Sequence, residues 1–221
     1  GIPKTLGTVF ILFEKQLTPV EKQNAITVME NAKFGMTGQN KVWLAGNVMM
    51  RALLQNDYEL VKMARDTIAS EIVTGGTEGI KDDWCFHQHG AQQQFGNYGL
   101  SFVSGMSFFS GLFSGTSLAF DDKQLSILST LIDKGYRWVI WKGMMDVNAL
   151  GRQLFHHAPV HKALSLAFAA SELGGGESDE CMAVATALLR DNYPALTVNV
   201  LTGHKHFWQS DYTIHRRPSW M

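Results

Sequence analysis

The sequence predicts an all-α fold built from antiparallel helical hairpins. Helix start and stop signals recur along the chain, whereas the alternation of apolar and polar residues that is typical of strands is scarce before residue 196. The short connections between the predicted helices favour antiparallel neighbours. With 221 residues, 45% hydrophobic and 18% charged, the chain can form one large ordered core. We expect a helical body over residues 1–195 and a tail over residues 196–221.

Capping signals and apolar stripes predict the first three helices. Thr18 and Glu21 form the capping box of a helix that we expect over residues 18–33. Two further helices are predicted over residues 38–55 and 57–72. The apolar stripe of the first of these two comprises Leu44, Val48, Met49, Ala52 and Leu53.

The rest of the chain continues the helical pattern around one polar segment. A glycine-rich break at residues 74–79 precedes residues 82–99, which have neither a helical nor a strand period. Asp121 and Gln124 form a second capping box. Further helices are predicted over residues 100–113, 121–141, 147–156, 161–173 and 178–193. In the tail, residues 197–201 come nearest to a strand.

The charge of the chain is balanced, and this limits its possible partners. Nineteen Lys and Arg residues face 20 Asp and Glu residues, so the net charge of -1 creates no global field that attracts a polyanion. The chain is not basic overall and contains no known nucleic-acid-binding motif, which argues against nucleic-acid binding. Any attraction to an anion must be local, and the best basic cluster lies in the tail. It comprises His204, Lys205, His206, His215, Arg216 and Arg217.

Neither membrane insertion nor a cysteine framework is expected. No apolar run approaches the roughly 20 residues that span a bilayer, and the first residues do not resemble a signal peptide. If the protein is exported, its signal has been removed. Cys85 and Cys181 lack the spacing of a metal site or a disulfide framework, so we expect both to be small core residues.

The polar segment at residues 82–99 is the best candidate site. It contains DDWCFHQHG and, one residue later, QQQFGNYG. Buried polar groups need partners, so this composition favours a polar cleft; a solvated loop around Trp84 and Phe86 is the alternative. His87 and His89 are not accompanied by another ligand cluster, and we therefore expect neither a metal nor a cofactor.

This segment resembles the catalytic segment of polysaccharide lyase family 8, which includes hyaluronate, chondroitin AC and xanthan lyases. A DGSFxQH-like stretch in that family carries a catalytic histidine, and a YxGxYG-like stretch nine residues later carries a catalytic tyrosine. DWCFHQH matches the first stretch and FGNYG the second. The resemblance therefore implies that His89 and Tyr98 are catalytic.

Two further segments match the family in order. TGQNK, at residues 37–41, resembles a TGAN(R) segment whose asparagine contacts the substrate carboxylate, which implies this role for Asn40. Gly151 and Arg152 resemble the start of a GRxxxR segment whose first arginine lies beside the tyrosine. Arg152 is the implied match.

The chain also departs from the family pattern. Trp84 replaces the glycine after the aspartate, Phe95 replaces the first tyrosine, and His156 stands where the second arginine is expected. Trp84 then enlarges the wall of the cleft, and His156 offers less positive charge to substrate. By family position, Phe34 belongs to the aromatic patch that supports the sugar rings.

The resemblance also implies an architecture. Family members are several times longer, with a toroid of helical hairpins followed by β-sandwich domains, so we expect an incomplete (α/α) toroid with a cleft across one end. Residues 211–218 resemble the segment that leads into the first β domain, where the family supplies a glutamate in an NGEN-like motif; this chain has none. We expect a missing β domain or a second chain to complete the site, and secretion or export to the periplasm.

These residue types suit β-elimination of a uronate polymer. The proton at C5 is too weakly acidic while the neighbouring carboxylate keeps its full charge, so hydrogen bonds from Asn40, assisted by His89, would stabilise the enolate-like state. A tyrosine acts as a base only where positive charge favours the phenolate, and Arg152 would supply that charge to Tyr98. Tyr98 then returns the proton to the glycosidic oxygen leaving C4. His89 is the alternative base.

Two other functions stay open. A glycoside hydrolase needs two opposed carboxylates, for which Asp82, Asp83 and Asp146 are available. Its long cleft would be lined by Trp43, Trp84, Trp138 and Trp141. The chain is alternatively a module that binds polysaccharide without cleaving it. The products discriminate these functions, because elimination leaves an unsaturated end, hydrolysis a saturated one, and a binding module neither.

Overall fold

The computed structural model describes residues 2–174, 185 and 201–221, and most of them are α-helical, which confirms the all-α prediction. The chain forms two compact units, residues 1–71 and 72–221. The toroid and the division at residue 195 remain predictions.

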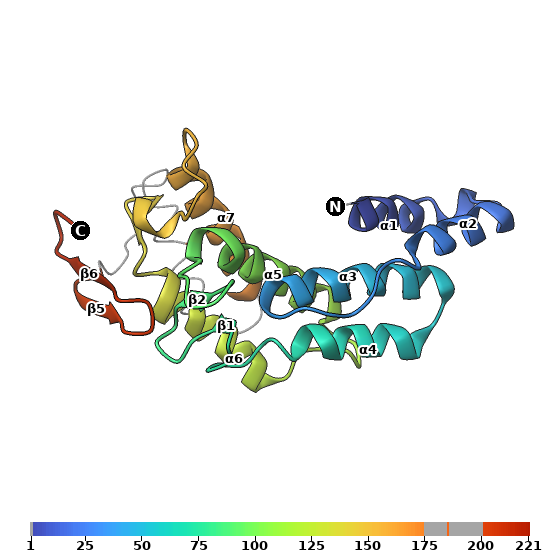
Figure 1. The fold of residues 1–221 in the computed structure, drawn as a ribbon, viewed down its shortest axis with the longest axis horizontal. Coiled ribbons are helices and arrows are strands. Elements are labelled where there is room, and N and C mark those ends of the chain that lie inside the picture. Colours follow the sequence, from blue (N-terminus) through green and yellow to red (C-terminus); the bar gives the residue numbers. More distant parts are fainter. Residues whose placement is uncertain (1, 175–184, 186–200) are drawn as a thin grey trace. The chain divides into compact units, whose positions relative to one another are not determined.

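The first unit consists of helices whose core lies between α1, α2 and α3 (Figure 1). Its elements are α1 (Ile2–Leu12), the 3₁₀ turn η1 (Glu14–Gln16), α2 (Pro19–Met29), α3 (Gly38–Gln55) and α4 (Tyr58–Ala69). Ile26, Met29 and Leu54 form a buried cluster against which Phe10 and Met50 pack. Two residues, Asn56 and Asp57, join α3 to α4, so these helices form an antiparallel hairpin.

Helix α2 has the predicted start and an earlier end. Thr18 and Glu21 form both bonds of the capping box, as predicted. The helix ends at Met29 rather than at residue 33 because Arg51, from α3, donates to the carbonyls of Glu30 and Ala32 at 3.3 and 3.1 Å. These carbonyls therefore need no further helical turn.

Helix α3 has the predicted bounds, and its buried face is shifted from the predicted stripe. Val48, Met49 and Ala52 are buried, as expected, whereas Leu53 is 42% exposed. Val42, Ala45 and Leu54 are also buried. Helix α1 was not predicted, because its sequence has no acidic residue in the first turn and no basic residue in the last.

The second unit combines helices with three short antiparallel ladders, β1–β2, β3–β4 and β5–β6 (Figure 1). The strands are β1 (Gly79–Ile80), β2 (Phe86–His87), β3 (Ile140–Trp141), β4 (Met144–Met145), β5 (Gly203–Phe207) and β6 (Tyr212–Arg216). The helical elements are the π-turn η2 (Phe95–Gly99), α5 (Leu100–Phe113), α6 (Asp122–Thr130), the π-turn η3 (Leu131–Tyr136), the 3₁₀ turn η4 (Val147–Ala149) and α7 (Ala158–Gly174). Helix α5 packs along α7.

Two of the predicted helices in this unit were wrong in extent. The helix expected over residues 121–141 has its predicted capping box and ends at Tyr136. Arg216, from β6, donates to the carbonyls of Arg137, at 2.7 Å, and Ile140, which satisfies them outside a helix. The helix expected over residues 147–156 is only the turn η4, because Gly151 adopts φ +61°, outside the helical region.

Other expectations fall partly outside the described residues. The helix predicted over residues 161–173 begins earlier, at Ala158. Apart from Ala185, the helix predicted over residues 178–193 lies outside the described residues, as do all but the last residue of the strand predicted over residues 197–201.

The β5–β6 hairpin also changes the interpretation of the basic cluster. His204, His206 and Arg217 are exposed, whereas Arg216 is 4% exposed and points into the unit to bind backbone carbonyls. Lys205 lies over the ring of Phe207, with its Nζ 5.0 Å from the ring centroid. The cluster is therefore not one solvated basic face.

In the described residues no helix combines the length and apolar character that crossing a membrane requires.

Candidate active site

The two candidate catalytic rings of the second unit touch. The centroids of the His89 and Tyr98 rings lie 4.9 Å apart with an interplanar angle of 83°, an edge-to-face contact. His89 is exposed, and Tyr98 is half-buried. The sequence predicted both residues, and the structure brings them together.

Tyr98 lies on a π-turn, a rare element that occurs frequently at functional sites. The turn is closed by the bond from the N–H of Gly99 to the carbonyl of Gln94, at 2.9 Å, and it leads directly into α5. A Cβ on Gly99 would lie 2.5 Å from Oη of Tyr136, whose hydroxyl donates to the carbonyl of Phe95 at 3.1 Å. Close packing thus requires glycine beside Tyr98.

The segment of Arg152 packs on the same π-turn. A Cβ on Gly96 would lie 2.6 Å from the carbonyl oxygen of Ala149, so backbone meets backbone there. Three residues later along this segment comes Arg152, whose neighbour Gln153 donates to Oδ1 of Asn97 at 3.0 Å. Arg152 is exposed. The structure therefore brings together the segments that carry Tyr98 and Arg152.

Lys162, from α7, connects these two segments. Its ammonium donates to the carbonyl of Gly96 and, at 2.5 Å, to Oε1 of Gln153. The residue is 7% exposed, and burial lowers the pKa of its side chain. Lys162 is thus a buried cation that fixes the Arg152 segment against the π-turn of Tyr98.

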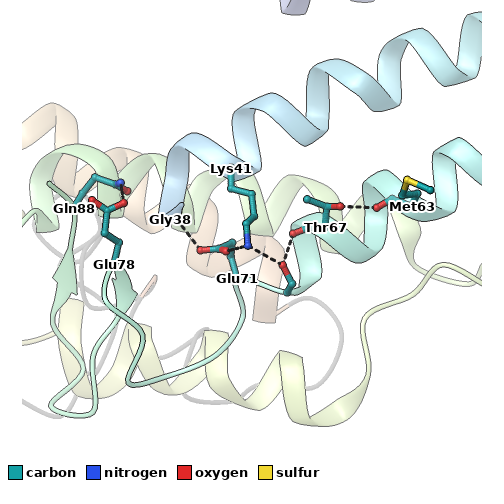
Figure 2. A network of polar contacts seen from close by, with 8 residues as sticks. Gly38, Lys41, Met63, Thr67, Glu71, Glu78 and Gln88 are labelled. Atoms are coloured by element: carbon teal, nitrogen blue, oxygen red, sulfur yellow. Dashed lines mark hydrogen bonds and ion pairs between the residues drawn. The ribbon is translucent and has the colours of Figure 1, made fainter. Parts of the chain in front are cut away.

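Glu78 fixes the segment that carries His89. One carboxylate oxygen accepts from the backbone N–H of His89 at 2.7 Å, and the other accepts from the side-chain amide of Gln88 (Figure 2). The backbone of His89 is in the left-handed region, with φ 61°. This conformation is uncommon for a residue other than glycine.

The loop between β1 and β2 is anchored by the turn between β5 and β6. Asp83 is fully buried, and its two carboxylate oxygens accept from the N–H groups of Cys85 and Gln209 at 3.0 and 2.8 Å. Nε2 of His87 lies 2.7 Å from Oγ of Ser210. The tail of the chain therefore contacts the loop that precedes His89.

Three groups near the site have structural roles. Burial raises the pKa of the Cys85 thiol to about 12, so it is neither a nucleophile nor a thiolate ligand at neutral pH, and it is the core residue that the sequence predicted. Asp146 accepts from the hydroxyl of Tyr212 and from the N–H of Asn148. Asp83 and Asp146 therefore have structural partners, whereas Asp82, the third carboxylate considered for a hydrolase, is exposed.

The first unit contains the other candidate segment. Asn40 is half-buried in the first turn of α3, whose N-cap Thr37 makes no capping bond through its side chain. Instead, Glu71 accepts from the N–H of Gly38 at 2.8 Å and from the ammonium of Lys41 at 2.5 Å (Figure 2). Glu71 therefore caps the turn that carries Asn40.

The predicted substrate-binding residues lie in different surroundings. Trp84 is half-buried at φ 69° in the turn between β1 and β2. His156 is exposed, and its ring centroid lies 3.7 Å from that of His157. Phe34 is half-buried in the connection between α2 and α3.

Sequence reasoning missed Glu71, Glu78 and Lys162. Each acts through contacts with residues that lie 9 to 66 positions away along the chain, and a periodic pattern does not reveal such contacts. One signal was available: residues 74–79 were recognised as a break, Glu78 lies within it, and Glu71 precedes it by three residues.

Comparisons with known proteins identify the family of this chain. Polysaccharide lyase family 8, N-terminal alpha-helical domain, matches residues 1–174. The chain is 27% identical over 226 residues to chondroitinase-AC of Pedobacter heparinus, covering 99% of this chain and 32% of that relative. It is 26% identical over 160 residues to xanthan lyase of a Bacillus species, covering 70% of this chain and 17% of that relative. The chain thus spans a third or less of these curated relatives.

Solved structures share the fold. A Paenibacillus xanthan lyase superimposes with a TM-score of 0.83 at 20% identity, over 98% of this chain and 24% of that one. Chondroitinase AC lyase, solved as enzyme–oligosaccharide complexes, superimposes with a TM-score of 0.81 at 25% identity, over 98% of this chain and 33% of that one. Since the family match covers most of the described residues, the chain belongs to polysaccharide lyase family 8, in the N-terminal α-helical domain.

Proposed function

We propose that this chain carries the helical part of the active site of a polysaccharide lyase, which cleaves a uronate-containing polysaccharide by β-elimination. The contact between the His89 and Tyr98 rings, 4.9 Å apart at their centroids, is the observation that carries the proposal. It joins the two residues that match the family's catalytic segments. The family membership and the names of the relatives, chondroitinase-AC and xanthan lyase, support the same reaction.

The proposed reaction begins with the substrate carboxylate. Hydrogen bonds from Asn40 and His89 stabilise the charge that moves onto the carboxylate oxygens as C5 loses its proton. The Tyr98 phenolate takes that proton, the electron pair forms the C4–C5 double bond, and the bond from C4 to the glycosidic oxygen breaks. The leaving oxygen then takes the proton from Tyr98.

Arg152 is proposed to supply the positive charge that favours the phenolate. The packing of Ala149 on Gly96 and the bond from Gln153 to Asn97 support this assignment, because they hold the Arg152 segment on the turn that bears Tyr98. The role of Asn40 rests on its match to the family segment and on its fixed helical turn.

The proposed substrate is an acidic polysaccharide of the glycosaminoglycan type. A solved relative, the chondroitin AC lyase of Streptomyces coelicolor, was obtained in complex with chondroitin sulphate. Phe34 and Trp84 are proposed to contact sugar rings, and His156 to offer a hydrogen bond in place of an arginine. We further propose that the protein acts outside the cytoplasm, and that a β domain or a second chain completes the site.

Product analysis tests the reaction type. The protein is incubated with hyaluronan, chondroitin sulfates and xanthan, and the products are followed by ultraviolet absorbance and mass spectrometry. Elimination predicts absorbance from an unsaturated uronate and oligosaccharides lighter by one water than hydrolysis products. Saturated products would indicate a hydrolase. Binding of a polymer without any product would indicate a binding module.

A further inference from the structure

Glu78 lies where the fold can control the backbone of His89. The residue directly precedes β1, whose register pairs Gly79 with His87 in β2. One step outward along this antiparallel pair, Glu78 is opposite Gln88, and His89 follows. The side-chain contacts agree with this register, since the carboxylate binds the Gln88 amide and the His89 N–H.

The conformation of His89 needs such a partner. A residue other than glycine in the left-handed region is strained, and surrounding contacts must hold it there. His89 has φ 61°, and Gly90 follows with φ 85°. A hydrogen bond to a charged group is stronger than one between neutral groups, so the 2.7 Å bond from the N–H of His89 to the Glu78 carboxylate opposes this strain.

We propose that Glu78 is a positioning residue that sets the His89 imidazole against the Tyr98 ring. This inference rests on the proposed function, in which His89 and Tyr98 act on one uronate. The buried amide of Gln88, 1% exposed, orients one carboxylate oxygen and leaves the other for the N–H of His89. Without the carboxylate, the backbone N–H of His89 loses its acceptor, and the imidazole is no longer held against the Tyr98 ring.

Three variants separate this role from a general effect of charge. Glu78→Ala removes both bonds. Glu78→Gln keeps an oxygen that accepts from the N–H of His89. Its new amide group faces the donating amide of Gln88, so the bond to Gln88 is lost. The double variant Glu78→Gln with Gln88→Glu reverses the direction of that bond and retains both contacts at the same net charge. Glu30→Gln, at the exposed C-cap of α2, is the matched control.

The expected change in kcat depends on when charge develops on the substrate carboxylate. His89 interacts most strongly when charge develops on the carboxylate, so misplacement lowers kcat and leaves KM nearly unchanged. A displacement of about 1 Å costs up to about 100-fold, so we expect kcat of Glu78→Ala to fall about 10- to 100-fold. The reversed pair should recover most of this loss, and the control should keep wild-type values.

A second readout does not depend on turnover. Nuclear Overhauser contacts between the ring protons of His89 and Tyr98 should be present in the wild type and in the reversed pair, and weak in Glu78→Ala. If the wild type cleaves no polymer, the proposed function fails, yet these contacts still test Glu78. Ring contacts of wild-type strength in folded Glu78→Ala would overturn the inference, as would a reversed pair that is folded but not rescued.

Discussion

Lys162 and Gln153 form a short link, 2.5 Å between Nζ and Oε1, that joins α7 to the segment of Arg152. Gln153 in turn binds Asn97, and Lys162 binds the carbonyl of Gly96. The link therefore closes around the π-turn that presents Tyr98. The arrangement holds the proposed base and the proposed cation on one rigid support.

Replacing Lys162 by methionine keeps most of the side-chain volume and removes both bonds. We expect a loss of about 1–3 kcal/mol in the free energy of unfolding, because the carbonyl of Gly96 and the amide of Gln153 lose a buried partner. Turnover should fall even where the variant is fully folded. Urea unfolding and kcat measure the two effects, and Lys123→Met, on exposed α6 surface, is the control. Wild-type stability in Lys162→Met would contradict the role of the link.

Adding a methyl group at Gly96 should separate the two segments. The new Cβ would lie 2.6 Å from the carbonyl oxygen of Ala149, so the segment leading to Arg152 must shift, at a cost of about 1–3 kcal/mol. The matched control is Gly111→Ala in α5, where a Cβ meets nothing within 4 Å and helix propensity predicts a gain of about 0.5–1 kcal/mol. Thermal unfolding of both variants checks the expected opposite signs.

His87 predicts a pH dependence of stability. Burial, and then the positive charge of Lys81, lower the pKa of His87 below its usual 6.5. As the pH falls through about 6.5, the unfolded chain binds a proton at this histidine before the folded chain does. The stability that neutral His87 contributes is therefore complete above that pH and declines below it. The urea midpoints of wild type and His87→Gln should differ at about pH 7.5 and lie closer together at about pH 5.5. An equal difference at both pH values would contradict this assignment.

Glu71 should control the order of the turn that bears Asn40. In Glu71→Ala the N–H of Gly38 loses its 2.8 Å acceptor and Lys41 loses its ion pair. We expect faster hydrogen–deuterium exchange over residues 38–41, corresponding to a loss of roughly 0.5–2 kcal/mol, as for a missing N-cap. Glu59→Ala, an exposed change in the same unit, should leave this exchange unaltered. Unchanged exchange in Glu71→Ala would show that the cap has another source.

Local signals were sufficient to predict some elements. Both capping boxes, Thr18 with Glu21 and Asp121 with Gln124, formed as expected because each is complete within four residues. The bounds of α3 and α5 were also correct, since the flanking glycine and polar residues mark them.

Contacts between distant segments decided where two of the predicted helices end. Arg51 ends α2, and Arg216 stabilises the non-helical backbone after Tyr136, from 76 to 79 positions away. In the candidate site too, local motifs predicted some residues and distant contacts determine others. His89 and Tyr98 were predicted from motifs nine residues apart, whereas the supporting Glu78 and Lys162 depend on pairing and packing that sequence patterns do not encode.

Comparison of Tyr98→Phe with Tyr58→Phe tests whether Tyr98 is the base that removes the C5 proton. Both variants lose one phenolic hydroxyl, the first beside His89 and the second on exposed α4. Rates of unsaturated-uronate formation are measured on folded proteins with the polymer that the wild type cleaves. We expect a loss of at least about 10²–10⁴-fold in kcat for Tyr98→Phe, with unchanged thermal stability, and wild-type rates for Tyr58→Phe. Wild-type turnover in Tyr98→Phe would show that another group removes the proton, with His89 the first to test.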